Sequence, residues 1–150
     1  MKRLFIFFII SGISLLSTAQ TPEDAVKQVV NNLFIAMKTG DATLLKKCFA
    51  DSAILQTIAT DKSGKTIIET EQIADFAALV NQQVKGSLDE RISFDIVKID
   101  GQLAMVWAPY KFYFKGIFSH CGVDSFQLVM INGEWKIQYL IDTRRKDKCE

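Results

Sequence analysis

Histidine is nearly absent from this sequence, with His120 as the only one among 150 residues. Cysteine is also scarce, at three residues, and no carboxylates or thiols cluster at the spacing of metal ligands. Because a zinc site in a protein needs three or four such ligands, we expect neither a metal site nor a cofactor. A block of basic residues is missing too, and the net charge is close to zero. Nucleic acid is therefore not an expected partner.

Proline is rare as well, at two residues, and the chain has no repeat, linker or low-complexity tract. Nothing in this composition separates one part of the chain from another as an independent unit. A chain of 150 residues without such boundaries predicts one folded domain.

The N-terminal segment has the pattern of a secretory signal peptide. A basic start, Met1–Arg3, precedes the apolar run Leu4–Leu16, which is too short to span a membrane comfortably. Small residues, Ser17 and Ala19, stand at the positions that favour cleavage after Ala19. No cysteine stands at the cleavage point, where Gln20 follows Ala19, so a lipid anchor is not expected. We predict a signal peptide over residues 1–19 and a mature domain over residues 20–150.

Export would place the mature domain in the periplasm or outside the cell, free of the membrane. Such compartments are oxidising, and three cysteines allow at most one internal disulfide. We favour Cys48–Cys149, because Cys149 lies in a tail that needs tethering and Cys48 ends a short predicted helix. Cys121 would then be a buried free thiol. The other two pairings remain open.

The first half of the mature domain predicts three helices and a short hairpin. Thr21 and Pro22 begin the first helix, and Gly40 ends it. Asp41 caps a shorter second helix, and Thr70 caps a third that ends before residues 86–87. A strand over residues 53–60, a turn over 61–65 and a return strand over 66–69 separate the second and third helices. Apolar residues recur at helical spacing in the two longer helices, at Val26, Val29, Val30, Leu33, Phe34, Met37, Ile73, Phe76, Ala77, Val80 and Val84.

The stretch Arg91–Asp142 predicts a four-stranded antiparallel meander. Its turns are Asp100-Gly101, Lys115-Gly116 and Asn132-Gly133, which suit two-residue hairpin loops. If each loop has two residues, the pairing register of the four strands is fixed, and the apolar side chains gather on one face of the sheet. That face collects Ile92, Phe94, Ile96, Leu103, Met105, Trp107, Phe126, Leu128, Met130, Trp135, Ile137, Tyr139 and Ile141, and the other face takes Ser93, Asp95, Ala104, Ser125, Gln127, Lys136, Gln138 and Asp142.

Together these elements predict an α+β fold. Its cone-shaped, curved antiparallel sheet, bent at Pro109 and Gly122, would hold the three N-terminal helices in its concave face. The open end of such a cone favours a ligand pocket. The outer face is also partly apolar, which predicts a homodimer through the backs of the sheets. The residues that suggest this contact are Ala104, Val106, Val123, Val129 and Leu140.

This order of elements resembles the nuclear transport factor 2-like, or SnoaL-like, superfamily. The C-terminal motifs resemble its exported bacterial branch, described as putative lumazine-binding proteins. The resemblance implies a cone-shaped fold, often dimeric, with a ligand-sized cavity. The catalytic residues of ketosteroid isomerase and scytalone dehydratase, which share the superfamily, do not map onto this chain. The motifs that carry the resemblance are Val106-Trp107-Ala108-Pro109-Tyr110, Phe118-Ser119-His120-Cys121-Gly122-Val123-Asp124, Gly133-Glu134-Trp135-Lys136-Ile137 and Asp142-Thr143-Arg144-Arg145.

One carboxylate interrupts the apolar face of the predicted sheet. Asp124 falls on that face, paired with Trp107 on one side and Ile141 on the other. Burial of a carboxylate raises its pKa unless hydrogen-bond donors compensate. Asp124 is therefore a candidate general acid, general base or ligand acceptor. The alternative is a structural aspartate that accepts from a tyrosine hydroxyl, the Trp107 indole or His120.

His120 shares the face of Asp124 but lies roughly 13 Å along an extended strand, so direct contact would need a bulge at Gly122. Tyr110 begins an aromatic run that either packs at the rim or forms a wall against a flat ligand. Tyr139 is the expected hydroxyl donor to a ligand or to Asp124. The predicted pocket residues are Trp107, Tyr110, His120, Asp124 and Tyr139, and the candidate catalytic residues are Asp124 and His120.

We expect an exported protein that binds a small apolar or planar molecule without turning it over. One alternative is a cofactor-independent isomerase or dehydratase that uses Asp124 with His120 or Tyr139. A second alternative is a non-catalytic dimeric interaction module whose cavity is filled by its own side chains.

Overall fold

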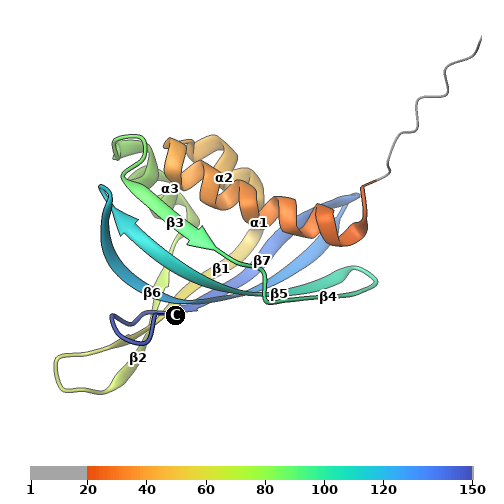
Figure 1. Ribbon diagram of the computed structural model, residues 1–150. Helices are drawn as coiled ribbons and strands as arrows, with labels where there is room; N and C mark the ends of the chain where they lie inside the picture. Colours follow the sequence, from red (N-terminus) through yellow and green to blue (C-terminus); the bar gives the residue numbers. More distant parts are fainter. Residues whose placement is uncertain (1–19, 150) are drawn as a thin grey trace, which may run out of the picture.

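The structure, a computed structural model, describes residues 20–149, and the predicted signal peptide Met1–Ala19 lies outside this range. Three helices cover the concave side of a curved sheet, and the β1–β2 hairpin extends away from them (Figure 1). None of the described helices combines the length and the apolar character that a membrane span requires. The elements are α1 (Pro22–Thr39), α2 (Ala42–Cys48), β1 (Phe49–Thr60), β2 (Thr66–Glu71), α3 (Ile73–Gln82), β3 (Leu88–Ile92), β4 (Ile96–Asp100), β5 (Leu103–Phe114), β6 (Ile117–Ile131) and β7 (Glu134–Thr143).

The seven strands of the described chain form one sheet in the order β2-β1-β7-β6-β5-β3, with β4 also paired to β5. All pairs are antiparallel except β1 and β7, which run parallel. The predicted α+β class and the helix-lined curved sheet are confirmed. The sheet is mixed rather than wholly antiparallel, because β1 enters beside the last strand of the meander.

The helix boundaries follow local capping chemistry. The Thr21 hydroxyl accepts from the Asp24 N–H, and the Asp41 carboxylate accepts from the N–H groups of Thr43 and Leu44. The third helix differs from the prediction, because Thr70 continues β2 in its ladder with β1 and Gln72 takes the N-cap position. α3 also ends earlier than predicted, at Gln82.

The first predicted strand of the meander is divided into β3 and β4. Ile92 pairs with Tyr110, whereas Ile96 pairs with Trp107, so the pairing register with β5 changes between them. Pro109 lies opposite this break, and its carbonyl accepts from the Ser93 N–H. Since proline has no N–H, it cannot complete the ladder on that side.

Two β-bulges decide which residues face the helices. In β6, Phe112 pairs with His120 and Tyr113 with Phe118, so Ser119 is the extra residue. In β7, Gln127 pairs with Tyr139 and Leu128 with Ile137, which leaves Gln138 as the extra residue. One extra residue moves every later side chain to the opposite face of the sheet. Pro109 and Gly122, predicted as bulge or bend points, carry no bulge between β5 and β6, since the register of this pair is continuous through both.

The bulge at Ser119 reverses the predicted faces of β5. In the first half of this strand Ala104, Val106 and Ala108 face the helices, and the larger apolar side chains between them face outward. Leu103, Met105 and Trp107 are 51%, 38% and 40% exposed, respectively. The turn before β5 is also shifted by one residue, because Asp100 pairs directly with Leu103. The predicted inward positions of Ile96, Leu103, Met105 and Trp107 are therefore wrong.

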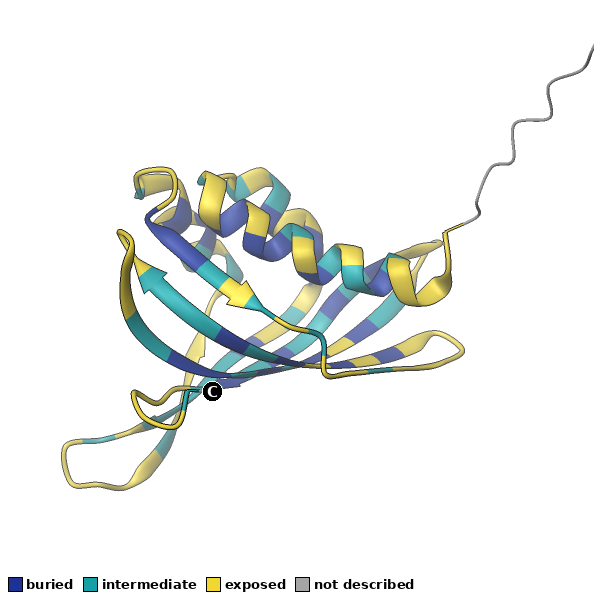
Figure 2. Ribbon diagram, in the orientation of Figure 1, coloured by how far each residue is buried: buried dark blue, intermediate teal, exposed yellow. Residues whose placement is uncertain are grey.

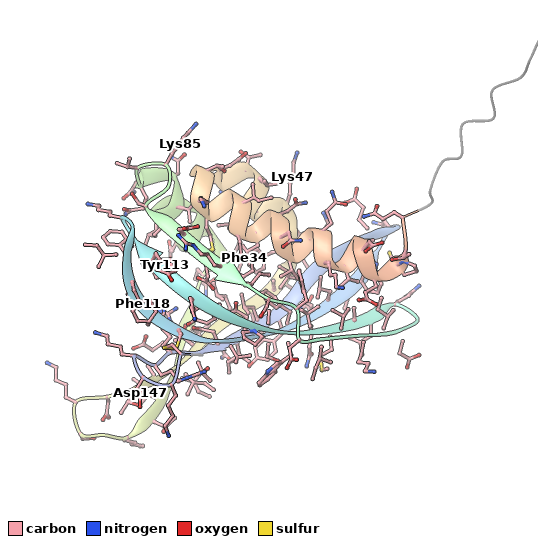
Figure 3. The ribbon with its side chains drawn as sticks, viewed as in Figure 1. Phe34, Lys47, Lys85, Tyr113, Phe118 and Asp147 are labelled. Atoms are coloured by element: carbon pink, nitrogen blue, oxygen red, sulfur yellow. A yellow bond between two sulfur atoms is a disulfide. The ribbon has the colours of Figure 1, made fainter. Side chains whose placement is uncertain are left out.

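The core lies between the helices and the concave face of the sheet, where the buried residues gather (Figure 2). Phe34 of α1 points from the helix toward the sheet (Figure 3), and its ring meets that of Phe126 edge-on at 6.2 Å. Small side chains on β5 let the helices approach the sheet closely. The fully buried members of this core include Val26, Val30, Leu33, Leu45, Val80, Val106, Phe126, Leu128 and Ile137.

Candidate functional site

A cavity of about 210 Å³ lies between the helices and the sheet. Its helix side is wholly apolar and is formed by Leu33, Phe34 and Met37 of α1 and by Phe76 and Leu79 of α3. Its sheet side is largely polar. The sheet-side residues are Leu55, Thr57, Glu71, Leu88, Glu90, Tyr110, Phe112, His120, Asp124, Leu140, Asp142 and Arg144.

Three of the five predicted pocket residues line this cavity, namely Tyr110, His120 and Asp124. Trp107 does not, because the Ser119 bulge places it on the outer face. Tyr139 does not line it either, because the Gln138 bulge places it outward, where its hydroxyl donates to Gln56 Oε1 at 2.8 Å. The pocket assignments of Trp107 and Tyr139 are wrong.

Asp124 is 4% exposed, and its neighbours in the sheet are Ala108 and Asp142 rather than Trp107 and Ile141. Among the described residues, no group donates a hydrogen bond to its Oδ2 atom. Burial raises the pKa of Asp124, and the nearby carboxylates of Glu90 and Asp142 raise it further. Asp124 therefore retains its proton well above the range of an ordinary aspartate.

Glu90 of β3 is the partner of Asp124, and the sequence reasoning missed it. Burial raises the pKa of Glu90 to about 7, opposed in part by a hydrogen bond with Asp124. Two ionised carboxylates have only acceptors, so this hydrogen bond requires a proton, which Asp124 donates. Glu90 and Asp124 thus form an acid pair that shares a proton at the cavity wall. The signal that could have revealed Glu90 was its alternation with Leu88 and Ile92, but the predicted meander began only at Arg91.

Asp142 is the second buried carboxylate of the site and is 7% exposed. It accepts from the hydroxyl groups of Thr57, at 2.6 Å, and Tyr110, at 3.0 Å. The Arg144 Nε atom lies 2.9 Å away, and Arg144 Nη2 also donates to Thr57 at 3.0 Å. Asp142 was predicted on the outer face, and the Gln138 bulge turns it inward. Unlike Asp124, it is fully supplied with donors.

His120 lines the cavity beside aromatic rings. Its ring lies 5.1 Å from that of Phe112 and 5.7 Å from that of Tyr110. Nδ1 is 3.0 Å from the Ser119 hydroxyl, and no hydrogen bond of the described residues joins His120 to Asp124. Burial lowers the pKa of His120, and the Arg144 charge lowers it further. His120 is therefore a neutral ring at pH 7 and contributes an aromatic wall.

Metal ligands are not grouped in the described part of the chain. Among residues 20–149, no three histidine, cysteine, aspartate or glutamate side chains are arranged to hold a metal ion. What the site offers chemically is an acid pair, a neutral imidazole and several aromatic faces.

Residues 21–139 match the family model described as "Putative lumazine-binding". This match covers most of the chain. The protein belongs to the putative lumazine-binding family. A comparison with curated proteins gave no match.

Solved structures show the same fold for this member of the putative lumazine-binding family. An NTF2-like protein of unknown function from Shewanella baltica OS155 is 17% identical with a TM-score of 0.62, covering 82% of this chain and 93% of its own. A domain of unknown function with a cystatin-like fold from Nostoc punctiforme PCC 73102 is 19% identical with a TM-score of 0.66, covering 88% and 81%. A putative dehydratase of the NTF2-like family from Streptomyces avermitilis is 13% identical with a TM-score of 0.61, covering 82% and 95%. At these identities the likeness shows the NTF2-like fold alone.

The C-terminal segment of this putative lumazine-binding protein is tied to the sheet beside the cavity. Cys121 and Cys149 form a disulfide, and Cys48 is a buried free thiol, so the predicted Cys48–Cys149 pair is wrong. The tail returns along β6, where the backbones of Cys121 and Arg145 exchange two hydrogen bonds of 2.9 Å. Cys48 instead faces the core at the end of α2. The pairing depends on this return of the tail, which has no local sequence signal.

Gly122 makes that return possible. A side chain at this position would collide with the Thr143 carbonyl and with the Tyr110 ring. The close approach brings Asp142 and Arg144 to the cavity wall, opposite the helices. Gly122 is therefore required for backbone proximity rather than for a bulge.

Proposed function

We propose that this protein binds a small planar molecule in the cavity between the helices and the sheet, without converting it to another product. The observation that carries the proposal is Asp124 Oδ2 of the Glu90–Asp124 acid pair, a buried oxygen at the cavity wall to which no group of the described residues donates a hydrogen bond. Buried polar atoms in proteins nearly always have a hydrogen-bond partner, and a ligand can provide one. The apolar helix side and the rings of Phe34, Phe76 and Phe112 suit a flat ligand.

The size of the cavity limits the ligand. At about 210 Å³ it lies below the roughly 300–1,000 Å³ typical of pockets for drug-sized molecules, so one or two fused rings are the expected size. The family description is consistent with this class, since a lumazine is a planar bicyclic heterocycle. An interaction module with a filled cavity is less consistent with this volume.

The test is native mass spectrometry of the protein as purified, followed by identification of any bound molecule. Leu79→Trp places a large ring at the cavity lining, and Val84→Trp, at a position 74% exposed and outside the lining, is its matched control. We expect Leu79→Trp to lose the co-purifying molecule and to bind no lumazine in a fluorescence titration. Val84→Trp should keep both properties. Equal binding by both variants would place the ligand elsewhere.

A second candidate function is proton-transfer catalysis of the isomerase or dehydratase type. Asp124 carries a proton next to Glu90 in a cavity, and such a pair can exchange protons with a bound substrate. Tyr139 has no part in this scheme, because it lies on the outer face. Incubation of the co-purifying molecule with the protein in D₂O tests it. Uptake of deuterium or loss of water that disappears in Asp124→Asn would favour the enzyme, and an unchanged molecule would favour binding.

We also propose that the protein is exported and forms a homodimer. The disulfide Cys121–Cys149 supports an oxidising compartment. The dimer surface predicted from Ala104, Val106 and Leu140 is wrong, because these residues are buried in the core. The outer face still carries exposed apolar side chains on neighbouring strands, namely Ile96, Leu103, Met105 and Trp107.

Two measurements test these proposals. N-terminal sequencing of the protein from the periplasm or medium would give Gln20 as the first residue if export follows the predicted signal. Sedimentation at micromolar concentration would give a dimer that Trp107→Asp converts to a monomer, and a monomeric wild type would contradict the dimer.

A further inference from the structure

Most of the hydrogen-bond donors at the cavity wall are already used within the protein. The hydroxyl groups of Thr57 and Tyr110 donate to Asp142, and Arg144 bonds both Asp142 and Thr57. Within the acid pair, by contrast, the buried Asp124 Oδ2 atom accepts no hydrogen bond from the described residues. A ligand seated against the pair must therefore bring N–H or O–H groups of its own.

Acidic side chains outnumber basic ones in the lining of the cavity. Among the described lining residues there are four carboxyl groups, on Glu71, Glu90, Asp124 and Asp142, and the only basic side chain of the lysine or arginine type is Arg144. The Arg144 charge is matched by Asp142 at 2.9 Å. The helices add no charge, since all their lining residues are apolar. Once the Asp142–Arg144 pair is set aside, the remaining ionisable groups are acids and a histidine.

From this inventory we propose that the cavity selects a small planar cation, such as an amidinium or a protonated aminopyrimidine, whose N–H groups bond to Glu90 and Asp124. The proposal rests on the proposed binding function and deepens it by naming the ligand class. The cation would take the place of the proton that Glu90 binds below pH 7, and its flat ring would lie against Phe112 and the neutral His120. Planar paired N–H donors match the two oxygens of a carboxylate.

Proton displacement makes binding depend on pH. The groups that face the acid pair from neighbouring elements are Glu71 of β2, Tyr110 of β5, His120 of β6, Asp142 of β7 and Arg144 after it. Glu90 has a pKa of about 7, so below pH 7 a cation must displace a proton and its affinity falls. The affinity is expected to drop by up to about tenfold per pH unit there, and to level off above the pKa.

The experiment compares three probes of nearly the same shape by isothermal titration calorimetry at pH 8. Benzamidine is a cation, benzamide is neutral and benzoate is an anion. We expect benzamidine to bind at least about tenfold more tightly than benzamide, because its hydrogen bonds to a carboxylate are charge-assisted, and benzoate not to bind. Titration at pH 6 in buffers of different ionisation enthalpy should show proton release with benzamidine alone.

Variants then locate the effect. Glu90→Gln and Asp124→Asn keep the side-chain shapes and should lower benzamidine affinity at least about tenfold, and Glu90→Gln should also abolish proton release. Glu134→Gln, at an exposed position on β7 outside the lining, is the matched control and should change neither. Circular dichroism of each variant checks that it is folded.

The outcomes separate this inference from the proposed function. Equal or tighter binding of benzamide or benzoate overturns the choice of a cation and leaves a binding cavity. Binding of benzamidine without proton release, or unchanged in both acid-pair variants, places the cation away from the pair and also overturns it. Failure of all three probes, together with no co-purifying molecule, would overturn the binding function itself.

Discussion

Replacing Glu90 with glutamine should make the protein more stable at high pH and leave it unchanged at low pH. The side chains have nearly the same shape, so the variant mainly removes a titrating group from the cavity wall. In the folded protein the pKa of Glu90 is raised from an ordinary 4.5 to about 7 by burial. Between these two values the folded protein keeps a proton that the unfolded chain releases.

The sign of the effect follows from this difference in proton binding. Because the folded state holds the extra proton, raising the pH from 4.5 through 7 lowers the free energy of unfolding, and the loss is complete above pH 7. A difference of about 2.5 pKa units corresponds to about 3 kcal/mol, which is an upper value for a group beside a second carboxyl. Glu90→Gln should recover up to this amount at pH 8 and almost none at pH 4.5.

Urea denaturation at pH 4.5 and pH 8 measures this effect in the wild type and in Glu90→Gln. For a chain of this length, about 3 kcal/mol corresponds to a rise of about 6–12 °C in melting temperature at pH 8. Glu134→Gln, whose carboxylate is exposed, provides the matched control and should show no such pH-dependent gain. An equal stability change at both pH values would refute the raised pKa of Glu90 and with it the acid pair.

Three further substitutions test other parts of the structure. Gly122→Ala should lower the free energy of unfolding by about 2 kcal/mol or more in urea titrations, because its methyl group collides with the backbone at Thr143. Cys149→Ser should cost about 3–4 kcal/mol by removing a cross-link over 28 residues, and a thiol reductant should then destabilise the wild type but not the variant. Trp107→Ala should leave ligand affinity unchanged in titrations, whereas Phe112→Ala should weaken it about tenfold, since only Phe112 lines the cavity. Equal effects of these last two would contradict the cavity as the binding site.

Local sequence signals determined much of the fold. The first two helices begin at Pro22 and Ala42, where capping residues predict them, because a cap acts within one turn of the chain. The turns Lys115-Gly116 and Asn132-Gly133 have positive φ at both residues, as the two-residue hairpin requires. The alternation of side chains along β6 also predicted the inner face for Asp124. This prediction holds because β6 has no extra residue between Asp124 and the Asn132-Gly133 turn.

The predictions were wrong where the face of the sheet that a side chain occupies depends on how its strand pairs with a neighbouring strand. An extra residue at Ser119 or Gln138 is tolerated because the neighbouring strand accommodates it, and no local pattern marks these two positions. Each such residue reverses all side chains beyond it, which moved Trp107 out of the pocket and brought Asp142 in. The cysteine pairing failed for a related reason, since it depends on where the C-terminal tail returns.

For this protein, then, the amino-acid sequence alone determined the order of elements, the α+β class and the inward position of Asp124, because caps, turns and periodicity act over a few residues. Only the tertiary structure decided that Glu90 meets Asp124, that Asp142 joins the site and that Cys121 bonds to Cys149. Those contacts join β3, β6, β7 and the C-terminal tail, and they form only when the sheet curves and its two bulges set the register.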